Sequence, residues 1–250
     1  MPHRPIPHRH AIILSAGQGS RLLPLTADKP KCLIDFAGKS LLRWQVEALA
    51  ANGVTDISVV TGFKSDVVEA ELAVLPGVRA EALFNPFYHV ADNLGSCWMA
   101  REKMVGEFVI LNGDTLVAPE IVATLLAKAS APITVTVDIK PDYDADDMKV
   151  ERKGDQLVAI GKTLSPLQAN AESIGMLAFD EVGGARFRRQ IEAMMRTPAG
   201  VSNWYLKAID AIAPEGVVGT VSIEGMDWAE VDFPQDVPIA EALAAKWAAA

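Results

Sequence analysis

The fold is decided by one stretch near the start of the chain, AIILSAGQGSRLLPLT at residues 11–26. Its first four residues are apolar, as in a buried strand of a parallel sheet, and small residues and glycines follow them. Small residues let the backbone approach a ligand closely and leave N–H groups free for phosphate oxygens. The stretch therefore predicts a strand that enters a ligand-binding turn.

Strands and helices alternate regularly from this stretch to residue 139. The apolar periodicity predicts strands at 56–60, 78–84, 108–111 and 133–139, and helices at 40–52, 65–75, 93–103 and 119–128. Such an alternation implies right-handed crossovers and a parallel sheet that is covered by helices on both faces. We therefore predict an α/β protein with a Rossmann-like, mixed and mainly parallel sheet.

The second half of the chain follows a different pattern. Short strands at 148–151, 156–160 and 173–179 are separated by turn signals, and they predict a small antiparallel extension laid against the first half. Helices at 185–195, 202–211 and 234–249 and a strand at 217–223 complete the prediction. Because the chain has no linker or sharp change in composition, we expect one domain over residues 11–250, after a flexible extension at residues 1–10.

Composition limits the partners and the compartment. The chain has 250 residues and a net charge of −9, which disfavours nucleic acid and anionic membranes as partners. Its longest apolar stretches are of strand length, so we expect no membrane insertion. Two cysteines, Cys32 and Cys97, are too few for a disulfide framework and suit a reducing compartment. We therefore expect a cytoplasmic protein.

Three cations follow the glycine-rich turn of this acidic chain. Arg21, Lys29 and Lys31 lie within eleven residues, and a triphosphate needs such charge compensation. Leu22 stands where a dinucleotide-binding turn would have its third glycine, and the Lys-Ser/Thr ending of a P-loop is missing. The turn residues that we predict to bind a nucleotide are Ser15, Ala16, Gly17, Gln18, Gly19 and Ser20.

Two acidic groups are candidates for a metal site. Asp114 directly follows a buried strand, where ligands bind in open α/β sheets, and Asp232 lies in a late acidic cluster. Mg²⁺ takes one or two protein carboxylates and completes its shell with water and substrate phosphates. We predict that Asp114 and Asp232 hold Mg²⁺, with Glu230 as a weaker candidate and Asp236 as a helix-start residue. A turn residue and a helix-start carboxylate are the alternatives for the pair.

Four segments together carry a family resemblance: GQGSR at 17–21, PLT at 24–26, KPKCL at 29–33 and GKSLL at 38–42. They resemble the signature of the sugar-phosphate nucleotidyltransferase superfamily. The resemblance implies a Mg²⁺-dependent enzyme that transfers a nucleoside monophosphate from an NTP to a small phosphorylated acceptor. It also implies catalytic roles for Arg21, at the β- and γ-phosphates, and for Lys31, at the α-phosphate and the attacking phosphate, with the backbone of Ala16 and Gly17 near the base.

Further segments look like the CTP:phosphocholine cytidylyltransferase branch: DNLGSC at 92–97, DADDMKV at 144–150, ESIGM at 172–176 and EVD at 230–232. This similarity implies CTP as the donor and places Asn93 and Ser96 near the nucleotide. It implies that Lys149 is a phosphate-binding cation that faces the acceptor. Residues 11–139 would then form a nucleotide-binding half, and residues 140–250 an acceptor-binding half that supplies the second metal carboxylate.

The sequence leaves the acceptor open. A quaternary ammonium group is attracted to aromatic faces, and Trp204 and Tyr205 are the best aromatic pair for that task, unless they only pack a helix against the sheet. Glu172 and Gly175 match positions where sugar-nucleotide relatives hold the sugar. The alternative acceptor is therefore a sugar 1-phosphate, with a uridylyl-, guanylyl- or thymidylyltransferase activity.

Other functional classes fit less well. An inactive nucleotide-binding regulatory protein would be expected to have lost its arginine or an aspartate, and a dehydrogenase would need an acidic residue after the strand at 56–60.

An acceptor phosphate is already an anionic nucleophile, so the enzyme must only align it and neutralise charge. The alanine-rich last helix packs either on its own domain or on a second copy, which leaves a homodimer as an open alternative.

Overall fold

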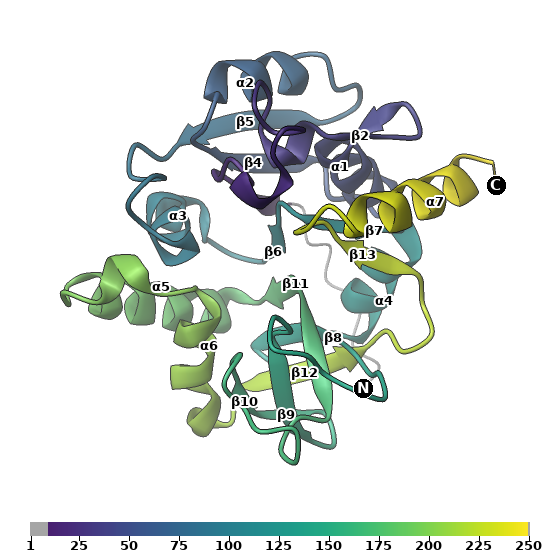
Figure 1. Cartoon of the computed structure of the whole chain (residues 1–250). Helices are drawn as coiled ribbons and strands as arrows, with labels where there is room; N and C mark the ends of the chain where they lie inside the picture. The colour runs from purple at the N-terminus through teal and green to yellow at the C-terminus, as the bar shows by residue number, and fades with distance from the viewer. Residues whose placement is uncertain (1–9, 250) are drawn as a thin grey trace.

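The computed structural model of the protein describes residues 10–249. One nine-stranded sheet runs through it (Figure 1). The strands of this sheet are β1 (His10–Ser15), β4 (Asp56–Thr61), β5 (Arg79–Phe84), β6 (Phe108–Asn112), β8 (Ile133–Asp138), β9 (Lys149–Lys153), β10 (Gln156–Ile160), β11 (Ala171–Phe179) and β12 (Val218–Ser222). Two small sheets pair β2 (Asp35–Phe36) with β3 (Lys39–Ser40), and β7 (Thr115–Val117) with β13 (Trp228–Glu230).

Seven α-helices are found in the described part of the chain. They are α1 (Leu41–Ala51), α2 (Ser65–Leu72), α3 (Asn93–Met99), α4 (Pro119–Lys128), α5 (Glu181–Met195), α6 (Leu206–Ile212) and α7 (Asp236–Ala248). Short 3₁₀ turns lie at Ser20–Leu22, Lys31–Leu33, Arg101–Lys103, Gly200–Ser202 and Ala213–Glu215. The predicted N-cap of the first helix is confirmed, because the Ser40 hydroxyl accepts a hydrogen bond of 3.1 Å from the Arg43 backbone N–H.

The large sheet has the strand order β5-β4-β1-β6-β11-β8-β12-β10-β9. The first four strands are parallel to one another, whereas β11 runs antiparallel to both of its neighbours, β6 and β8. Farther along, β12 is parallel to β8, and β9 and β10 form an antiparallel hairpin. Because β1 and β6 are parallel, the loops that follow Ser15 and Asn112 leave the same edge of the sheet.

Both faces of the sheet are buried. Successive residues of β1 point to opposite faces: Ile12 belongs to the core that includes α3, α5 and α6, and Ile13 to the core that includes α1, α2 and α4. Burial of each such side chain contributes about 1.5–3 kcal/mol. A third cluster joins α7 to Phe36 and Trp44, so the last helix packs on its own chain through the buried Ala240 and Ala244.

The predicted fold class is confirmed, and most predicted elements are present with shifted ends. The helix predicted at 65–75 ends at Leu72, and the helix predicted at 93–103 is divided into α3 and a 3₁₀ turn. The helix predicted at 202–211 begins only at Leu206, which leaves Trp204 in the loop before it. The expected flexible extension at residues 1–10 lies outside the described residues, except for His10, which begins β1. Within residues 10–249, none of the helices combines the length and the apolar character that crossing a membrane requires.

One prediction about the second half is wrong. The strand predicted at 173–179 does not belong to an extension, because β11 lies in the interior of the sheet between β6 and β8. All nine residues of β11 are buried, as expected for a strand covered on both faces. Of the three strands predicted for the extension, only β9 and β10 come last in the strand order, and β9 also pairs with the first residues of β11.

Gly175 of β11 has a left-handed backbone, with φ of +75°, and a side chain there would collide with the amide of Asn112. We therefore expect Gly175→Ala to destabilise the protein by about 3 kcal/mol, because it adds a steric clash to backbone strain. Gly154 is the matched control, since its φ is +61° but its Cα faces open space. Gly154→Ala should cost about 1 kcal/mol. Urea denaturation of both variants tests this, and equal losses would contradict the clash.

Candidate active site

The glycine-rich turn after β1 folds back against the segment that carries Lys31. The Lys31 backbone N–H donates to the Gln18 carbonyl at 3.2 Å, and the Thr26 hydroxyl donates to the Gly19 carbonyl at 2.8 Å. A side chain at Gly19, whose φ is +76°, would come within 2.7 Å of the Lys31 Cβ. Glycine is therefore required at this position so that the lysine can cross the turn.

Three carboxylates meet beside this turn. Asp114 follows β6, Glu230 ends β13 and Asp232 follows it, and one oxygen atom from each lies within 4.8 Å of the other two. Antiparallel pairing of β13 with β7 brings them together, because Glu230 lies opposite Thr115 and the Val231 N–H donates to the Asp114 carbonyl at 3.0 Å. The two predicted carboxylates thus converge, and the weaker candidate Glu230 joins them.

Two cations face these carboxylates. The Lys31 ammonium donates to Asp114 at 2.9 Å and to Asp232 at 2.6 Å. The Arg21 guanidinium contacts Asp232 at 3.2 Å and lies 5.0 Å from the centre of the Phe233 ring. The structure therefore places both predicted catalytic cations and both predicted metal ligands in one cluster.

The charges of the cluster shift one another's ionisation. Although burial opposes it, attraction to Asp114 and Asp232 raises the pKa of Lys31. Burial favours the neutral acid at Asp232, but Lys31 and Arg21 outweigh it and lower the pKa of that carboxyl. Burial and the negative charges of Asp114 and Asp232 raise the pKa of Glu230 to about 8. Burial first, and then the like charges, therefore favour the neutral acid at Glu230.

The cluster has the donor set of a divalent cation site. Three carboxylates supply the hard oxygen ligands that Mg²⁺ prefers, and one oxygen of Asp114, Oδ1, is buried without a hydrogen-bond partner in the described part of the chain. A bound cation would also relieve the repulsion among these carboxylates. The residues that are present therefore fit Mg²⁺.

The two residues predicted to lie near the nucleotide are part of a hydrogen-bonded support. The Asn93 carbonyl oxygen Oδ1 accepts from the Tyr205 backbone N–H at 2.9 Å, which leaves its amide N–H groups to donate elsewhere. The Ser96 hydroxyl accepts from the Asn85 amide at 3.2 Å. Both residues lie on α3, and the loop before α6 contacts the N-terminal end of this helix.

The predicted aromatic pair is divided between core and surface. Tyr205 is fully buried and its ring packs edge-on to Phe187 at 6.3 Å, so the prediction that it meets an acceptor is wrong. Burial also raises the pKa of its hydroxyl. Trp204 is 43% exposed, and the ammonium of Lys162 lies 5.1 Å from its ring centre. The packing alternative therefore holds for Tyr205 and not for Trp204.

Lys162 is a site residue that the sequence reasoning missed. Its ammonium lies 3.9 Å from Asp146, and its positive charge opposes the rise in the pKa of Glu230 and adds to the lowering of the pKa of Asp232. The predicted cation Lys149 is buried and donates to the Lys162 carbonyl at 3.1 Å, so it fixes the backbone of that residue. Lys162 could have been found from the sequence, because it closely follows the predicted strand at 156–160 in an acidic chain.

A cavity of 530 Å³ opens beside the carboxylate cluster. Its charged lining is mostly acidic: Asp138, Lys140, Asp144, Asp146, Asp147, Glu172, Glu230, Asp232 and Asp236. Glu172 is paired with Lys140 at 2.8 Å, yet burial raises its pKa to about 7. The Trp228 indole donates to Asp138 at 2.9 Å. The cavity is suited to a ligand that carries positive charge or several hydroxyl groups.

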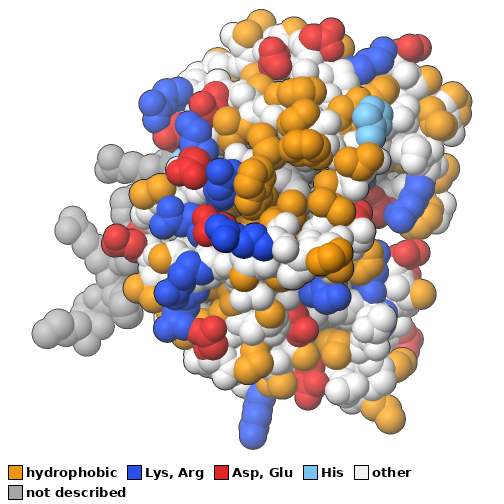
Figure 2. All heavy atoms as spheres, turned by 90° about the vertical axis from the view of Figure 1, so that its left-hand side faces the viewer, with side chains coloured by type: hydrophobic (Ala, Val, Ile, Leu, Met, Phe, Trp, Pro, Cys, Tyr) orange, Lys and Arg blue, Asp and Glu red, His pale blue; other side chains and the backbone are white. Residues whose placement is uncertain are grey.

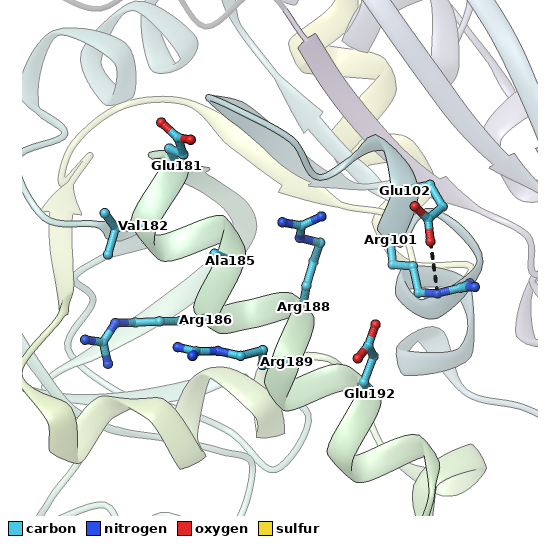
Figure 3. A pocket seen from close by; sticks show the side chains of 9 residues that line it. All are labelled: Arg101, Glu102, Glu181, Val182, Ala185, Arg186, Arg188, Arg189 and Glu192. Atoms are coloured by element: carbon cyan, nitrogen blue, oxygen red, sulfur yellow. Dashed lines mark ion pairs between the residues drawn. The ribbon is translucent and has the colours of Figure 1, made fainter.

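Two further cavities lie away from this cluster. One of 630 Å³ is formed by α5 and the 3₁₀ turn after α3, and Figure 3 shows Arg188 of α5 on the side of the Arg101–Glu102 pair, whereas Arg186 and Arg189 extend away from it. The other, of 460 Å³, is lined by apolar side chains of α3, α5 and their loops, on a face where hydrophobic and basic groups adjoin (Figure 2). Neither cavity contains a predicted site residue. The start of α5 lies at the far end of β6 from the carboxylate cluster, because Phe179, just before α5, pairs with the first residue of β6. The carboxylate cluster follows the last residue of that strand.

Comparison with known proteins agrees with this geometry. Residues 10–150 match the family described as "Nucleotidyl transferase". The chain is 25% identical to CTP:phosphoglutamine cytidylyltransferase of Campylobacter jejuni, over 92% of this chain and 98% of that protein. It is 35% identical to choline-phosphate cytidylyltransferase of Streptococcus pneumoniae, over 40% of this chain and 42% of that protein. The inositol-1-phosphate CTP transferase structure from T. maritima superposes with a TM-score of 0.81 at 23% identity, over 96% of each chain.

The chain therefore belongs to the nucleotidyl transferase family. The predicted resemblance to this superfamily is confirmed, and the curated relatives include enzymes that are named for their use of CTP. The structural match supports the predicted fold.

The raised pKa of Glu172 predicts a pH-dependent stability. Its pKa is about 7 in the folded protein and near 4.5 in the unfolded chain, so the folded state loses stability as the pH rises between these values. The free energy of unfolding of the wild type should fall by an amount on the order of 2 kcal/mol between pH 5 and pH 7.5. This fall should be missing in Glu172→Gln, because glutamine does not titrate. Urea denaturation at both pH values measures it, with Glu192→Gln, an exposed glutamate of α5, as the control. Parallel pH profiles for wild type and Glu172→Gln would contradict the assignment.

Proposed function

We propose that this protein is a cytidylyltransferase that transfers CMP from CTP to a small phosphorylated acceptor and releases pyrophosphate. The observation that carries the proposal is the cluster in which Arg21 and Lys31 meet Asp114, Glu230 and Asp232. The choice of CTP is supported by the names of the relatives from C. jejuni and S. pneumoniae, both of which are cytidylyltransferases.

In this reaction an oxygen of the acceptor phosphate bonds to the α-phosphorus of CTP, and the bond from that phosphorus to the oxygen bridging to the β-phosphate breaks. The attacking oxygen is already anionic, so no protein base is required. Lys31 neutralises charge where the two phosphates meet, and Arg21 binds the departing pyrophosphate with its guanidinium fork. The Arg21 side chain is 54% exposed, which leaves it accessible to the incoming triphosphate.

Asp114, Asp232 and Glu230 would hold Mg²⁺ in this site. When bound, the ion supplies positive charge to the phosphate oxygens. Lys31 now shares two of these carboxylates, and it can exchange them for phosphate oxygens when they serve a divalent cation.

The turn after β1 is the proposed site of the nucleotide. Ser15 ends β1, the residues that follow it are Ala16, Gly17, Gln18, Gly19 and Ser20, and the turn lies on the edge of the sheet that carries Asp114. Gly17 has open space beside its Cα, as close approach of a ligand requires. Asn93 and Ser96 of α3 would complete the site, with the Asn93 amide free to donate a hydrogen bond.

The proposed acceptor combines a phosphate with an ammonium group. Lys162, supported by Lys149, supplies positive charge for the phosphate, and the carboxylates of the 530 Å³ cavity attract the ammonium group. The acceptors in the names of the two relatives, phosphoglutamine and choline phosphate, both combine a phosphate group with a positively charged nitrogen. Glu172 lines this cavity, whereas the backbone of Gly175 is packed against Asn112.

A polyol or sugar phosphate is the second candidate for the acceptor. Carboxylates such as Asp147 and Glu172 also accept hydrogen bonds from hydroxyl groups, and the T. maritima structure is that of an inositol-1-phosphate CTP transferase. Such an acceptor would keep the chemistry of the cluster and change only the group that occupies the cavity.

The test is pyrophosphate release by the purified protein with Mg²⁺, over four NTPs and a set of acceptors: phosphocholine, 2-aminoethylphosphonate, phosphoglutamine, inositol 1-phosphate and glucose 1-phosphate. Release with CTP and an amine-bearing acceptor supports the proposal. Release with CTP and a polyol phosphate replaces the acceptor, and release with another NTP overturns the assignment of CTP. If nothing is released although CTP raises the melting temperature, the protein binds CTP but uses none of these acceptors.

Removal of Arg21 tests the role of the first cation. Arg21→Ala should lower kcat/KM for CTP by about a hundredfold or more, because a charge-assisted contact to the leaving group is lost. Arg43→Ala is the matched control, since Arg43 is an exposed helix residue paired with Glu47. The control should retain wild-type turnover, and both variants should melt within a few degrees of wild type. A merely twofold effect of Arg21→Ala would exclude the pyrophosphate role.

Asp114→Asn tests the metal site. We expect this variant to lose more than 99% of its Mg²⁺-dependent turnover and the rise in melting temperature that Mn²⁺ or Mg²⁺ gives with CTP, because a charged ligand is lost. Asp155→Asn, in the turn between β9 and β10, should retain both. Unchanged metal dependence in Asp114→Asn would remove this residue from the site.

A further inference from the structure

Trp204 and Lys162 form a pair whose two members come from different elements. Trp204 precedes α6 and Lys162 follows β10, and the lysine ammonium lies 5.1 Å from the indole centre. A cation within about 6 Å of a tryptophan ring centre is attracted to the ring, and tryptophan is the strongest of the aromatic partners. The partly exposed indole thus already binds a cation of the protein itself.

The backbone on both sides of this pair is fixed. The buried Lys149 ammonium holds the Lys162 carbonyl at 3.1 Å, and the Ile160 N–H donates to the Asp210 carboxylate of α6 at 2.9 Å. The orientation of the Lys162 side chain then depends on its own rotamer. Since a lysine side chain has many rotamers, a contact with the indole restricts it to those that keep the ammonium near Trp204.

The Lys162 side chain points toward the proposed reaction site. The same ammonium lies 3.9 Å from Asp146, which lines the 530 Å³ cavity, and its charge reaches Glu230 and Asp232. Lys31 faces the carboxylate cluster from the first half of the chain. Lys162 belongs to the second half, where the proposed acceptor phosphate would enter.

We infer that Trp204 is a positioning residue, whose indole holds the Lys162 ammonium in place for the acceptor phosphate. The inference rests on the proposed function. It assigns Trp204 to the phosphate of the acceptor, through Lys162, rather than to direct contact with an acceptor ammonium group. Its effect should therefore be the same for acceptors with and without an amine.

A double-mutant cycle tests the inference by calorimetric titration of phosphocholine and of inositol 1-phosphate into the full-length protein. Trp204→Leu should raise the Kd of both ligands about three- to tenfold, and Trp204→Phe should recover part of the loss. In a Lys162→Met background, Trp204→Leu should change either Kd by less than about 1.5-fold, because its target is gone. Trp98→Leu, which breaks a similar pair with Arg101 away from the site, is the matched control and should change neither Kd.

Three results would overturn the inference. Independent, multiplicative effects of the two substitutions would show that Trp204 does not act through Lys162. A loss confined to phosphocholine would make Trp204 a direct ligand of the ammonium group, and failure of wild type to bind either compound would remove the acceptor role of the pair. Failure of the proposed function is distinguishable, because it appears as wild-type protein that binds these ligands but releases no pyrophosphate.

Discussion

The contact of the Lys31 ammonium with Asp114 and Asp232 is the interaction on which the site depends. It joins residues that are 83 and 201 positions away in the sequence, at 2.9 and 2.6 Å. Without the lysine, three carboxylates would crowd one another with little compensation, as the raised pKa of Glu230 already indicates. The absence of a side chain at Gly19 lets the lysine reach this position, and the pairing of β13 with β7 brings the late carboxylates to it.

Most of this cluster could be predicted from the sequence because its parts follow strand ends. Arg21, Lys31 and Asp114 are each set by a short segment next to β1 or β6, and parallel strands deliver such segments to the same edge. Asp232 was predicted from its acidic neighbourhood and the resemblance. The place of Glu230 depended on the register of β13 against β7, which no local pattern specifies.

The features that could not be predicted depend on contacts between distant segments. The strand at 171–179 is apolar or small at nearly every position, which indicates burial but not which strands lie beside it. Trp204 and Tyr205 are adjacent and chemically alike, yet one is exposed and the other is enclosed with Phe187 of α5. Lys162 has no motif of its own among the segments that carry the resemblance, and it becomes a site residue only because β10 and α6 are held together by Ile160 and Asp210.

The central position of β11 gives the proposed chemistry its geometry. If phosphates of two substrates react between Lys31 and Lys162, the distance between these cations must be fixed to a fraction of an ångström. They belong to different halves of the chain, and β11 of the second half pairs with β6 and β9 along one side and with β8 along the other. The last four residues of β11 pair with β6, its first two pair with β9, and both of its ends pair with β8. The strand whose place in the sheet was predicted wrongly from the sequence therefore holds the two cation-bearing halves in register.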